Sequence, residues 1–572
     1  MKIATGRKSI DRSLILAAVV TLVQLPLLWC WPADWFDTGF NMTFYENIYT
    51  HPASVEYNFM YWLTGIVGGA VHAVLPGIFP LRLLALLINV CCALLVNRVV
   101  SDFRAMLVGT LMVSFGLYCS DSVFHYNHLT LLLTVSSLVV MMRGRRRGML
   151  LSGILAGVMV FARVSNIAGL GYMLLTFLFA QCGRRWKSAL IWLGGYAAGV
   201  AACLLLMLCL GHLGIFISNM RELADIAVAG EASHGIGPLM DVTYDNWWHI
   251  YHYRIHTNEL LQPEPVWVPL MCVILALLLI FTRRPYRYEA LLATGAMALM
   301  ILSINFRRVL LTDASIMYTL TFCACVGIVI SFFTPGWRKK GIAAAMMLAI
   351  LPLGSDNTFL NLGPMLLWLA LPVGIAAMLA ASRLKPRNDK AVGKGTRRRN
   401  LLAPFVFGGW CAVAAVTSFF CVWQAFANNR GNSAYRTRVT NNIRAMVSGN
   451  VPEGTEILVY GGAPMLYYLT GTLPAYGNSW PEQLAPAALA KKLADGPDPE
   501  FVVLMDCDPD SPLPLLKASP VPGPFARGVA GANRYHTSEK SGILLRFLGD
   551  NGYRPMAAVP GAILYRRCRQ PN

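Results

Sequence analysis

Apolar stretches separated by short loops run through most of the 572-residue chain. A helix needs about 20 apolar residues to cross a bilayer, and we predict about thirteen such helices. They lie at residues 13–32, 78–97, 105–120, 129–142, 148–166, 167–182, 188–213, 266–282, 288–304, 309–333, 341–354, 364–382 and 401–424. Only 13% of the residues are charged, against about a quarter in soluble domains. The sequence therefore predicts an α-helical polytopic membrane protein.

Basic residues gather in every second loop. The clusters are Lys2/Arg7/Lys8/Arg12, Arg98/Arg104, Arg143/Arg145/Arg146/Arg147, Arg184/Arg185/Lys187, Arg283/Arg284/Arg287, Arg338/Lys339/Lys340 and the run from Arg383 to Arg399. Because Lys and Arg are retained on the cytosolic side during insertion, we expect a cytosolic N-terminus and a C-terminal tail on the outer face. The formal net charge of +19 then reflects membrane topology rather than a nucleic-acid partner.

Three segments outside the predicted spans are large: a first loop at 33–77, a later loop at 214–265 and a tail at 426–572. Aromatic residues in the first loop predict two amphipathic helices, broken at His51-Pro52. Strands and helices alternate in the tail, which predicts a small α/β domain with a largely parallel sheet. We therefore divide the chain into a membrane domain, 1–425, and an outer-face α/β domain, 426–572.

Acidic residues where the chain leaves the membrane are candidates for acid-base chemistry. Asp37 follows the first span and suits a general base for an acceptor hydroxyl or amine, while Asp34 reads as a loop acid. Asp121, at the outer end of another span, could join Asp37 around a divalent cation such as Mg²⁺ or Mn²⁺, since both ions prefer oxygen ligands. Glu56 is a further catalytic or metal-binding candidate, although acidic residues on amphipathic helices usually lie on the solvent-exposed face.

Arg163 is a positive charge at the outer end of its span, against the general trend, and it suits the phosphate of a lipid donor. Arg307 and Arg308 could form a second phosphate clamp. The alternative for all three is an arginine that extends its head group to the interface.

Polar residues near the same outer ends are candidate substrate contacts. They are Asn166, His125, His128, Asp356 and Asn357. The histidines could contact a phosphate or a sugar, and the Asp356-Asn357 loop could complete a carbohydrate-binding cleft. Helix caps and a tight turn are the structural alternatives.

The order of these parts resembles the GT-C superfamily of membrane glycosyltransferases, which includes protein O-mannosyltransferases and the lipid A aminoarabinose transferase. The segments F-A-R-V-S-N at 161–166, G-S-D-N at 354–357 and P-M-L-Y-Y-L-T-G at 464–471 look like parts of GT-C-like proteins of Bacteroidota. The resemblance implies an enzyme of the bacterial cytoplasmic membrane that uses a polyprenyl-phosphate-linked sugar, such as an undecaprenyl-phosphate sugar, and transfers it with inversion.

By position, the resemblance makes Asp37 the catalytic base, and the acceptor would be an envelope glycan, a lipid or a protein. The Asp-Glu dipeptide of the protein mannosyltransferases does not occur in the first loop, which makes a protein acceptor of that class less well supported.

Two other functions fit parts of the pattern. A polysaccharide polymerase or ligase of the O-antigen or capsule kind often carries its large loop later in the chain, and the 214–265 loop contains Asp241, Asp245 and His249. A non-enzymatic lipid or sugar transporter would normally show internal repeats, and we find none in the sequence.

Overall fold

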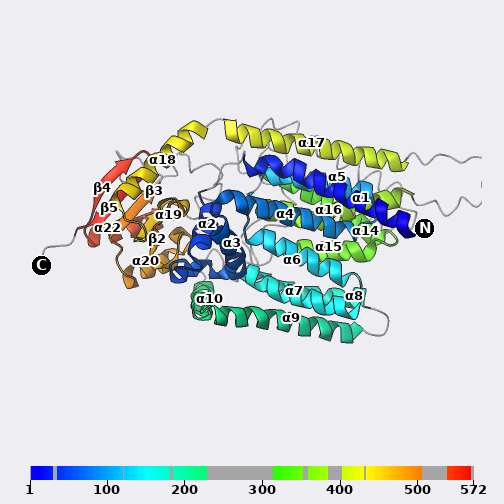
Figure 1. Ribbon diagram of the computed structural model, residues 1–572, viewed down its shortest axis with the longest axis horizontal. Helices are drawn as coiled ribbons and strands as arrows, with labels where there is room; N and C mark the ends of the chain where they lie inside the picture. The colour runs from blue at the N-terminus through cyan, green and yellow to red at the C-terminus, as the bar shows by residue number, and fades with distance from the viewer. Residues whose placement is uncertain are drawn as a thin grey trace, which may run out of the picture.

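The computed structural model describes residues 2–29, 35–119, 122–180, 185–228, 313–351, 359–383, 402–430, 433–505 and 538–568. Within these ranges the chain forms a bundle of long helices with a small sheet at one end (Figure 1). The N-terminus lies at the opposite end of the bundle (Figure 1). We call the two ends the sheet end and the N-terminal end.

The long helices of the bundle follow the predicted spans closely. They are α1 (Lys2–Gln24), α4 (Ile78–Asn97), α5 (Phe103–Gly116), α6 (Tyr126–Met141), α7 (Arg146–Ala162), α9 (Arg185–Cys209), α14 (Asp313–Phe333), α15 (Arg338–Ile350), α16 (Phe359–Arg383) and α17 (Leu402–Arg430). One predicted span, 167–182, differs, because its residues 167–179 fall within a 3₁₀ helix η4 (Val164–Leu175) and a one-turn helix α8 (Thr176–Phe179). The spans predicted at 266–282 and 288–304 lie outside the described residues.

Four helices in the described part of the chain are long and apolar enough to cross a membrane: Ile78–Asn97, Arg185–Cys209, Leu366–Arg383 and Ala403–Trp423. Five shorter apolar helices stand beside them. The prediction of a helical membrane protein is thereby confirmed, while the total of about thirteen spans stays a prediction.

Small residues let two of these helices approach closely. Gly153 and Gly157 of α7 face the backbone of α9, and Gly195 and Gly199 of α9 face the backbone of α7; a Cβ at any of the four would collide with it. Glycines four residues apart on both partners are typical of helix pairs in membranes, where close van der Waals contact replaces the hydrophobic effect.

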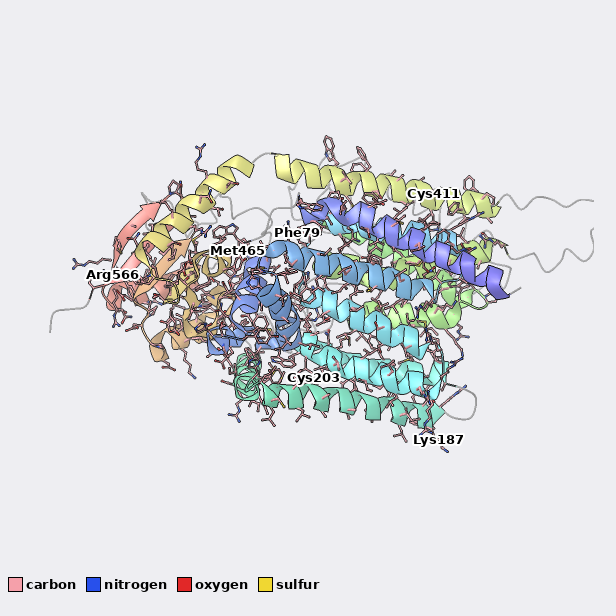
Figure 2. All side chains as sticks on the ribbon, in the orientation of Figure 1. Phe79, Lys187, Cys203, Cys411, Met465 and Arg566 are labelled. Carbon is pink, nitrogen blue, oxygen red and sulfur yellow. The ribbon has the colours of Figure 1, made fainter. Side chains whose placement is uncertain are left out.

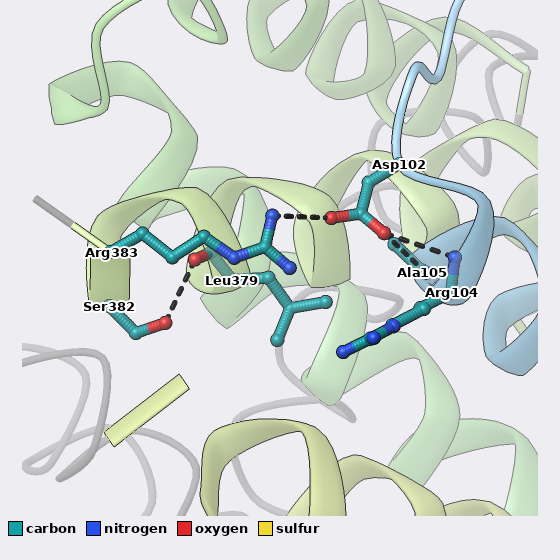
Figure 3. A network of polar contacts seen from close by, with 6 residues as sticks. All are labelled: Asp102, Arg104, Ala105, Leu379, Ser382 and Arg383. Atoms are coloured by element: carbon teal, nitrogen blue, oxygen red, sulfur yellow. Dashed lines mark hydrogen bonds and ion pairs between the residues drawn. The ribbon is translucent and has the colours of Figure 1, made fainter. Parts of the chain in front are cut away.

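The N-terminal end of the bundle collects basic loops. Asp102 caps α5 by accepting from the Arg104 and Ala105 amides, at 3.0 and 3.4 Å, and its other oxygen pairs with Arg383 in the last turn of α16 at 2.9 Å (Figure 3). Two loops predicted to share the cytosolic side are therefore neighbours. Lys187, from a third basic loop, lies at the end of α9 away from the sheet (Figure 2).

The first loop folds into helices divided at His51-Pro52, as predicted, but they number three rather than two, and the first is buried on nearly all sides. They are α2 (Asp37–Asn47), the 3₁₀ helix η2 (Pro52–Tyr61) and α3 (Trp62–Val74). These helices lie between the bundle and the sheet (Figure 1). Helix α10 (Leu213–Val228) follows α9 at the same end.

The C-terminal α/β unit, residues 433–505 and 538–568, forms a five-stranded sheet in the order β2-β1-β3-β5-β4. Its elements are α18 (Ser433–Asn450), β1 (Glu456–Tyr460), α19 (Met465–Thr470), β2 (Leu473–Pro474), α20 (Pro486–Asp495), β3 (Phe501–Met505), α22 (Ser538–Asp550), β4 (Tyr553–Val559) and β5 (Ala562–Arg567).

The sheet is mixed, not largely parallel as the sequence predicted. Strands β2 and β3 run parallel to β1, whereas β5 pairs antiparallel with β3 and with β4. The difference arises because only two residues connect β4 to β5, and so short a connection can only make an antiparallel hairpin.

Candidate functional site

Asp37 is the first residue of α2 and its side chain is exposed. Its position is fixed by hydrogen bonds to the backbone on both sides. The Asn41 side-chain amide donates to the Asp37 carbonyl at 2.7 Å, and the Trp35 carbonyl accepts from the Met465 backbone amide at 3.2 Å. A carboxylate at a helix N-terminus is stabilised by the helix dipole. The predicted base therefore lies at an accessible position where the first loop meets the C-terminal α/β unit.

Helix α2 rests directly on α19. Gly39 lies so close to Met465 that a Cβ would overlap the backbone of α19, and Figure 2 shows Met465 beside α2. The Thr43 hydroxyl donates to the Pro464 carbonyl at 2.9 Å. The C-terminal unit thus helps to determine where Asp37 is held.

Two further acids come from the first loop. Glu56, on η2, is half-buried and packs near Gly477, where a Cβ would lie 3.1 Å from the Glu56 Cβ. Glu46, on α2, is also half-buried, and burial together with the nearby Glu453 raises its pKa to about 7. Glu46 was not among the residues singled out from the sequence, because the Glu453 charge that acts on it lies about 400 residues away in the chain.

Arg163, predicted to bind the donor phosphate, and Asn166, predicted to contact the substrate, are brought together in a buried network. The Arg163 guanidinium donates to the Asn166 and Asn127 side-chain oxygens at 3.3 and 3.4 Å and to the Leu351 carbonyl. Asn166 in turn donates to the Thr130 hydroxyl at 2.8 Å. Arg163 is only 4% exposed, so it links the start of α6, the start of η4 and the end of α15 from inside the bundle.

His125 and His128 cap the start of α6. The His125 Nδ1 accepts from the Asn127 amide, and the His128 Nδ1 accepts from the His125 amide, both at 3.3 Å. Burial and the neighbouring Arg163 lower the pKa of His125 to about 3, which keeps its ring neutral. Both Nδ1 atoms accept hydrogen bonds, so the second ring nitrogen of each is the protonated one.

A cavity at the sheet end contains a charged residue that we did not select from the sequence. Its polar lining is Gln24, Arg82, Asn89, Ser122 and His128, and its volume of about 10 Å³ is about enough for one water molecule. Arg82 lies one turn into α4, 7% exposed, and donates to the Leu28 carbonyl at 3.1 Å. Phe79, three residues earlier, is at the sheet end of the helices (Figure 2).

The cavity lining also contains polar atoms with no hydrogen-bond partner. They are Oδ1 of Asn89 and the hydroxyl of Ser122. Gln24 accepts from Asn89 at 3.0 Å and donates to Ser114 at 3.3 Å. The sequence signal that could have identified Arg82 was a single cation inside an otherwise uncharged apolar helix.

The remaining candidates lie outside the described residues. They are Asp121, Arg307, Arg308, Asp356 and Asn357. Among the residues that are described, no group of three or more His, Cys, Asp or Glu side chains could hold a metal ion. The predicted Asp37/Asp121 pair therefore stays a prediction.

No protein-family model matches the chain, and no curated protein is significantly similar to it in sequence. Among solved structures, the chain is similar to ArnT from Cupriavidus metallidurans bound to undecaprenyl phosphate, with 11% identity over 97% of this chain and 98% of that one and a TM-score of 0.47. The apo state of that protein gives 12% identity, 98% coverage of both chains and a TM-score of 0.44.

The chain is also similar to the archaeal oligosaccharyltransferase AglB from Archaeoglobus fulgidus, in complex with an inhibitory peptide and a dolichol-phosphate. The identity is 12%, over 88% of this chain and 70% of that one, with a TM-score of 0.48. Scores and identities this low do not assign the chain to a family, so the function proposed below rests on the chain's own residues.

Proposed function

We propose that this protein is a GT-C-type membrane glycosyltransferase that transfers a sugar from a polyprenyl-phosphate carrier to an envelope glycan, lipid or protein. The observation that carries the proposal is the cavity around Arg82. A cation inside an apolar helix is costly and usually marks a functional position. Here it lines a cavity together with the Ser122 hydroxyl. The space of about one water molecule gives one oxygen of a phosphate group both a charge partner and a hydrogen-bond donor.

The lipid donor places its phosphate at Arg82 and its apolar chain along the helices. Arg163 acts on the same phosphate indirectly. It donates a hydrogen bond to Asn127, and the next residue, His128, lines the cavity. Arg307 and Arg308 stay candidates for a second clamp.

Asp37 serves as the general base. It accepts the proton of the acceptor hydroxyl, and the acceptor oxygen attacks the anomeric carbon on the face opposite the phosphate. The bond between that carbon and the phosphate oxygen breaks, and the phosphate leaves with the electron pair, so the sugar is inverted. The donor is already activated, and this chemistry needs no nucleotide.

A divalent cation shared by Asp37 and Asp121 is part of the proposal, with Glu56 as a further acid. Chelation with EDTA followed by addition of Mg²⁺ or Mn²⁺ tests this cation site. Transfer activity that is lost on chelation and restored by either ion supports the shared site. Activity that EDTA does not affect excludes a required cation.

The proposed location is the bacterial cytoplasmic membrane, with the C-terminal α/β unit in the periplasm. A reporter fused after Lys385 should read cytosolic, and one fused after Asn432 should read periplasmic. Reporters that read the same side would exclude a span between them.

Replacement of Arg82 tests the donor site. We expect Arg82→Met to weaken binding of undecaprenyl phosphate by about 10- to 100-fold, since a hydrogen bond to a charged group contributes about 1.5–3 kcal/mol. Arg82→Lys should recover part of the affinity because it keeps the charge. Arg104→Met is the matched control, since Arg104 starts a helix at the other end of the bundle, over the Phe407 ring.

Binding to the purified protein in nanodiscs is measured by native mass spectrometry, with thermal unfolding as the check on folding. Equal affinity for undecaprenyl phosphate in wild type, Arg82→Met and Arg104→Met would show that Arg82 does not bind the donor. The same preparations distinguish the rival functions: chain elongation would favour a polymerase or ligase, and lipid translocation without transfer would favour a transporter.

A further inference from the structure

The C-terminal sheet has a topological switch point beside its central parallel strand. From β1 the chain passes through α19 to β2 on one side, and then through α20 to β3 on the other. In open α/β sheets, ligands bind outside the carboxyl ends of the strands at such a point. Gly461 follows β1 there, with φ +124°, and a Cβ would lie 2.6 Å from the carbonyl oxygen of Met505 at the end of β3.

The side chain that reaches this point is Glu482. One carboxylate oxygen accepts from the amides of Gly461 and Gly462, the latter at 3.0 Å. Two adjacent backbone amides directed at one place form an anion-binding arrangement, and here the anion is the chain's own carboxylate. A phosphate group would therefore meet a negative charge where a nucleotide-binding turn would offer free amides.

The other oxygen of Glu482 has no hydrogen-bond partner, although the residue is fully buried. The same is true of the side-chain amide nitrogen of Asn478 and of the hydroxyl of Ser479, in residues that are each 1% exposed. An unsatisfied buried polar group costs about 1–3 kcal/mol, so three within five residues require a physical reason.

The surrounding contacts hold this segment in place. The Asn478 side-chain oxygen accepts from the Trp480 amide at 2.8 Å, which leaves its NH₂ group directed elsewhere. Lys540 of α22, itself 5% exposed, donates to the Glu482 carbonyl at 2.7 Å. The backbone of the segment is thus fixed while three side-chain groups remain available.

We propose that residues 478–482 form a carbohydrate-binding subsite for the acceptor. A sugar with neighbouring hydroxyl groups can donate to the Glu482 oxygen, accept from the Asn478 amide and do either with the Ser479 hydroxyl. A phosphate is repelled by Glu482, and a hard cation prefers several oxygen ligands to an amide NH₂. The inference rests on the proposed glycosyltransferase function and specifies its acceptor as a hydroxyl-rich glycan.

The position of the segment relative to Asp37 supports an acceptor role. Trp480 packs against Phe36, the residue before α2, and against Phe40 of α2, with ring centroids 5.6 and 6.3 Å apart. These two phenylalanines flank Asp37 in the sequence. A sugar bound at 478–482 is therefore held on the side of the C-terminal unit that faces the helix with the proposed base.

Saturation-transfer difference NMR tests the subsite with the full chain in nanodiscs and the methyl glycosides of glucose, mannose and galactose as probes. We expect transfer to at least one glycoside, and a loss of affinity of about 5- to 10-fold in Ser479→Ala. Asn478→Asp should lose a similar amount, because it keeps the acceptor for Trp480 but removes the donor. Gln483→Ala, a half-buried neighbour in the same turn, is the control that should bind normally.

The melting temperature separates binding from folding. Ser479→Ala breaks no hydrogen bond of the structure, so its melting temperature should equal or exceed that of the wild type. No glycoside signal in the wild type would mean that water alone occupies these groups, and equal signals in all variants would place the sugar elsewhere; either result overturns the proposal.

The assay needs neither donor nor transfer, so it is independent of the Arg82 experiment. Glycoside binding with unchanged donor affinity in Arg82→Met would keep the subsite and reject the proposed donor site. Loss of donor binding in that variant, with no glycoside signal in the wild type, would support the proposed donor site and reject the subsite.

Discussion

The buried position of Glu46 and its repulsion by the Glu453 charge predict that stability depends on pH where the first loop meets the C-terminal unit. Burial, followed by the Glu453 charge, raises the pKa of Glu46 from 4.5 to about 7. The folded protein therefore binds this proton more tightly than the unfolded chain does. The stability that depends on the proton is fully present below pH 4.5 and is lost as the pH rises through 7.

The size of the effect follows from the shift. A difference of about 2.5 units at about 1.36 kcal/mol each gives a ceiling of about 3 kcal/mol. Glu46 is only half-buried, so solvent screening reduces this to about 1–2 kcal/mol. Glu46→Gln removes the titration, and at pH 8 we expect it to be more stable than the wild type by that amount, or about 2–4 °C in melting temperature.

Thermal unfolding of both proteins between pH 4.5 and pH 8.5 measures the prediction, and the difference between the two curves isolates Glu46 from other titrating groups. Glu453→Gln should show the same sign with a smaller size, because the Glu453 charge is the lesser cause of the shift. Glu539→Gln, an exposed residue on α22, is the control. Parallel curves for wild type and Glu46→Gln would show that the Glu46 carboxyl titrates normally.

Three further substitutions test the site and its support. Asp37→Asn keeps the size of the side chain but not its basicity, and should lower transfer by about 10²–10⁴-fold; near-normal turnover would exclude Asp37 as the base. Gly39→Ala forces a methyl group against Met465 and should destabilise the protein by about 1–3 kcal/mol in thermal unfolding, whereas Gly194→Ala, which meets open space, should not. Arg163→Met strips its partners of a buried donor and should cost about 3 kcal/mol; an unchanged melting temperature would contradict a supporting role for that network.

Local sequence patterns were sufficient for the element boundaries. Helix α4 spans residues 78–97 as expected, because hydropathy is a property of neighbouring residues. The break at His51-Pro52 followed from the restricted backbone before proline. Strand β2, with only two residues, left no detectable pattern.

Contacts between distant segments could not be predicted in the same way. The cavity around Arg82 combines residues of α1, α4 and the segment before α6, and Glu482 meets Gly461 only because the sheet brings them together. The sequence did single out both Arg163 and Asn166. It did not indicate that both would be buried and hydrogen-bonded inside the bundle, since burial depends on the packing of α6 and α15 around them.

The close approach of Gly39 to Met465 has a consequence for motion. Two backbones without an intervening side chain cannot slide past one another, so α2 and α19 move as one body. Asp37, at the start of α2, is then carried with the whole C-terminal sheet. Any opening that admits a large acceptor therefore moves the proposed base together with the acceptor platform.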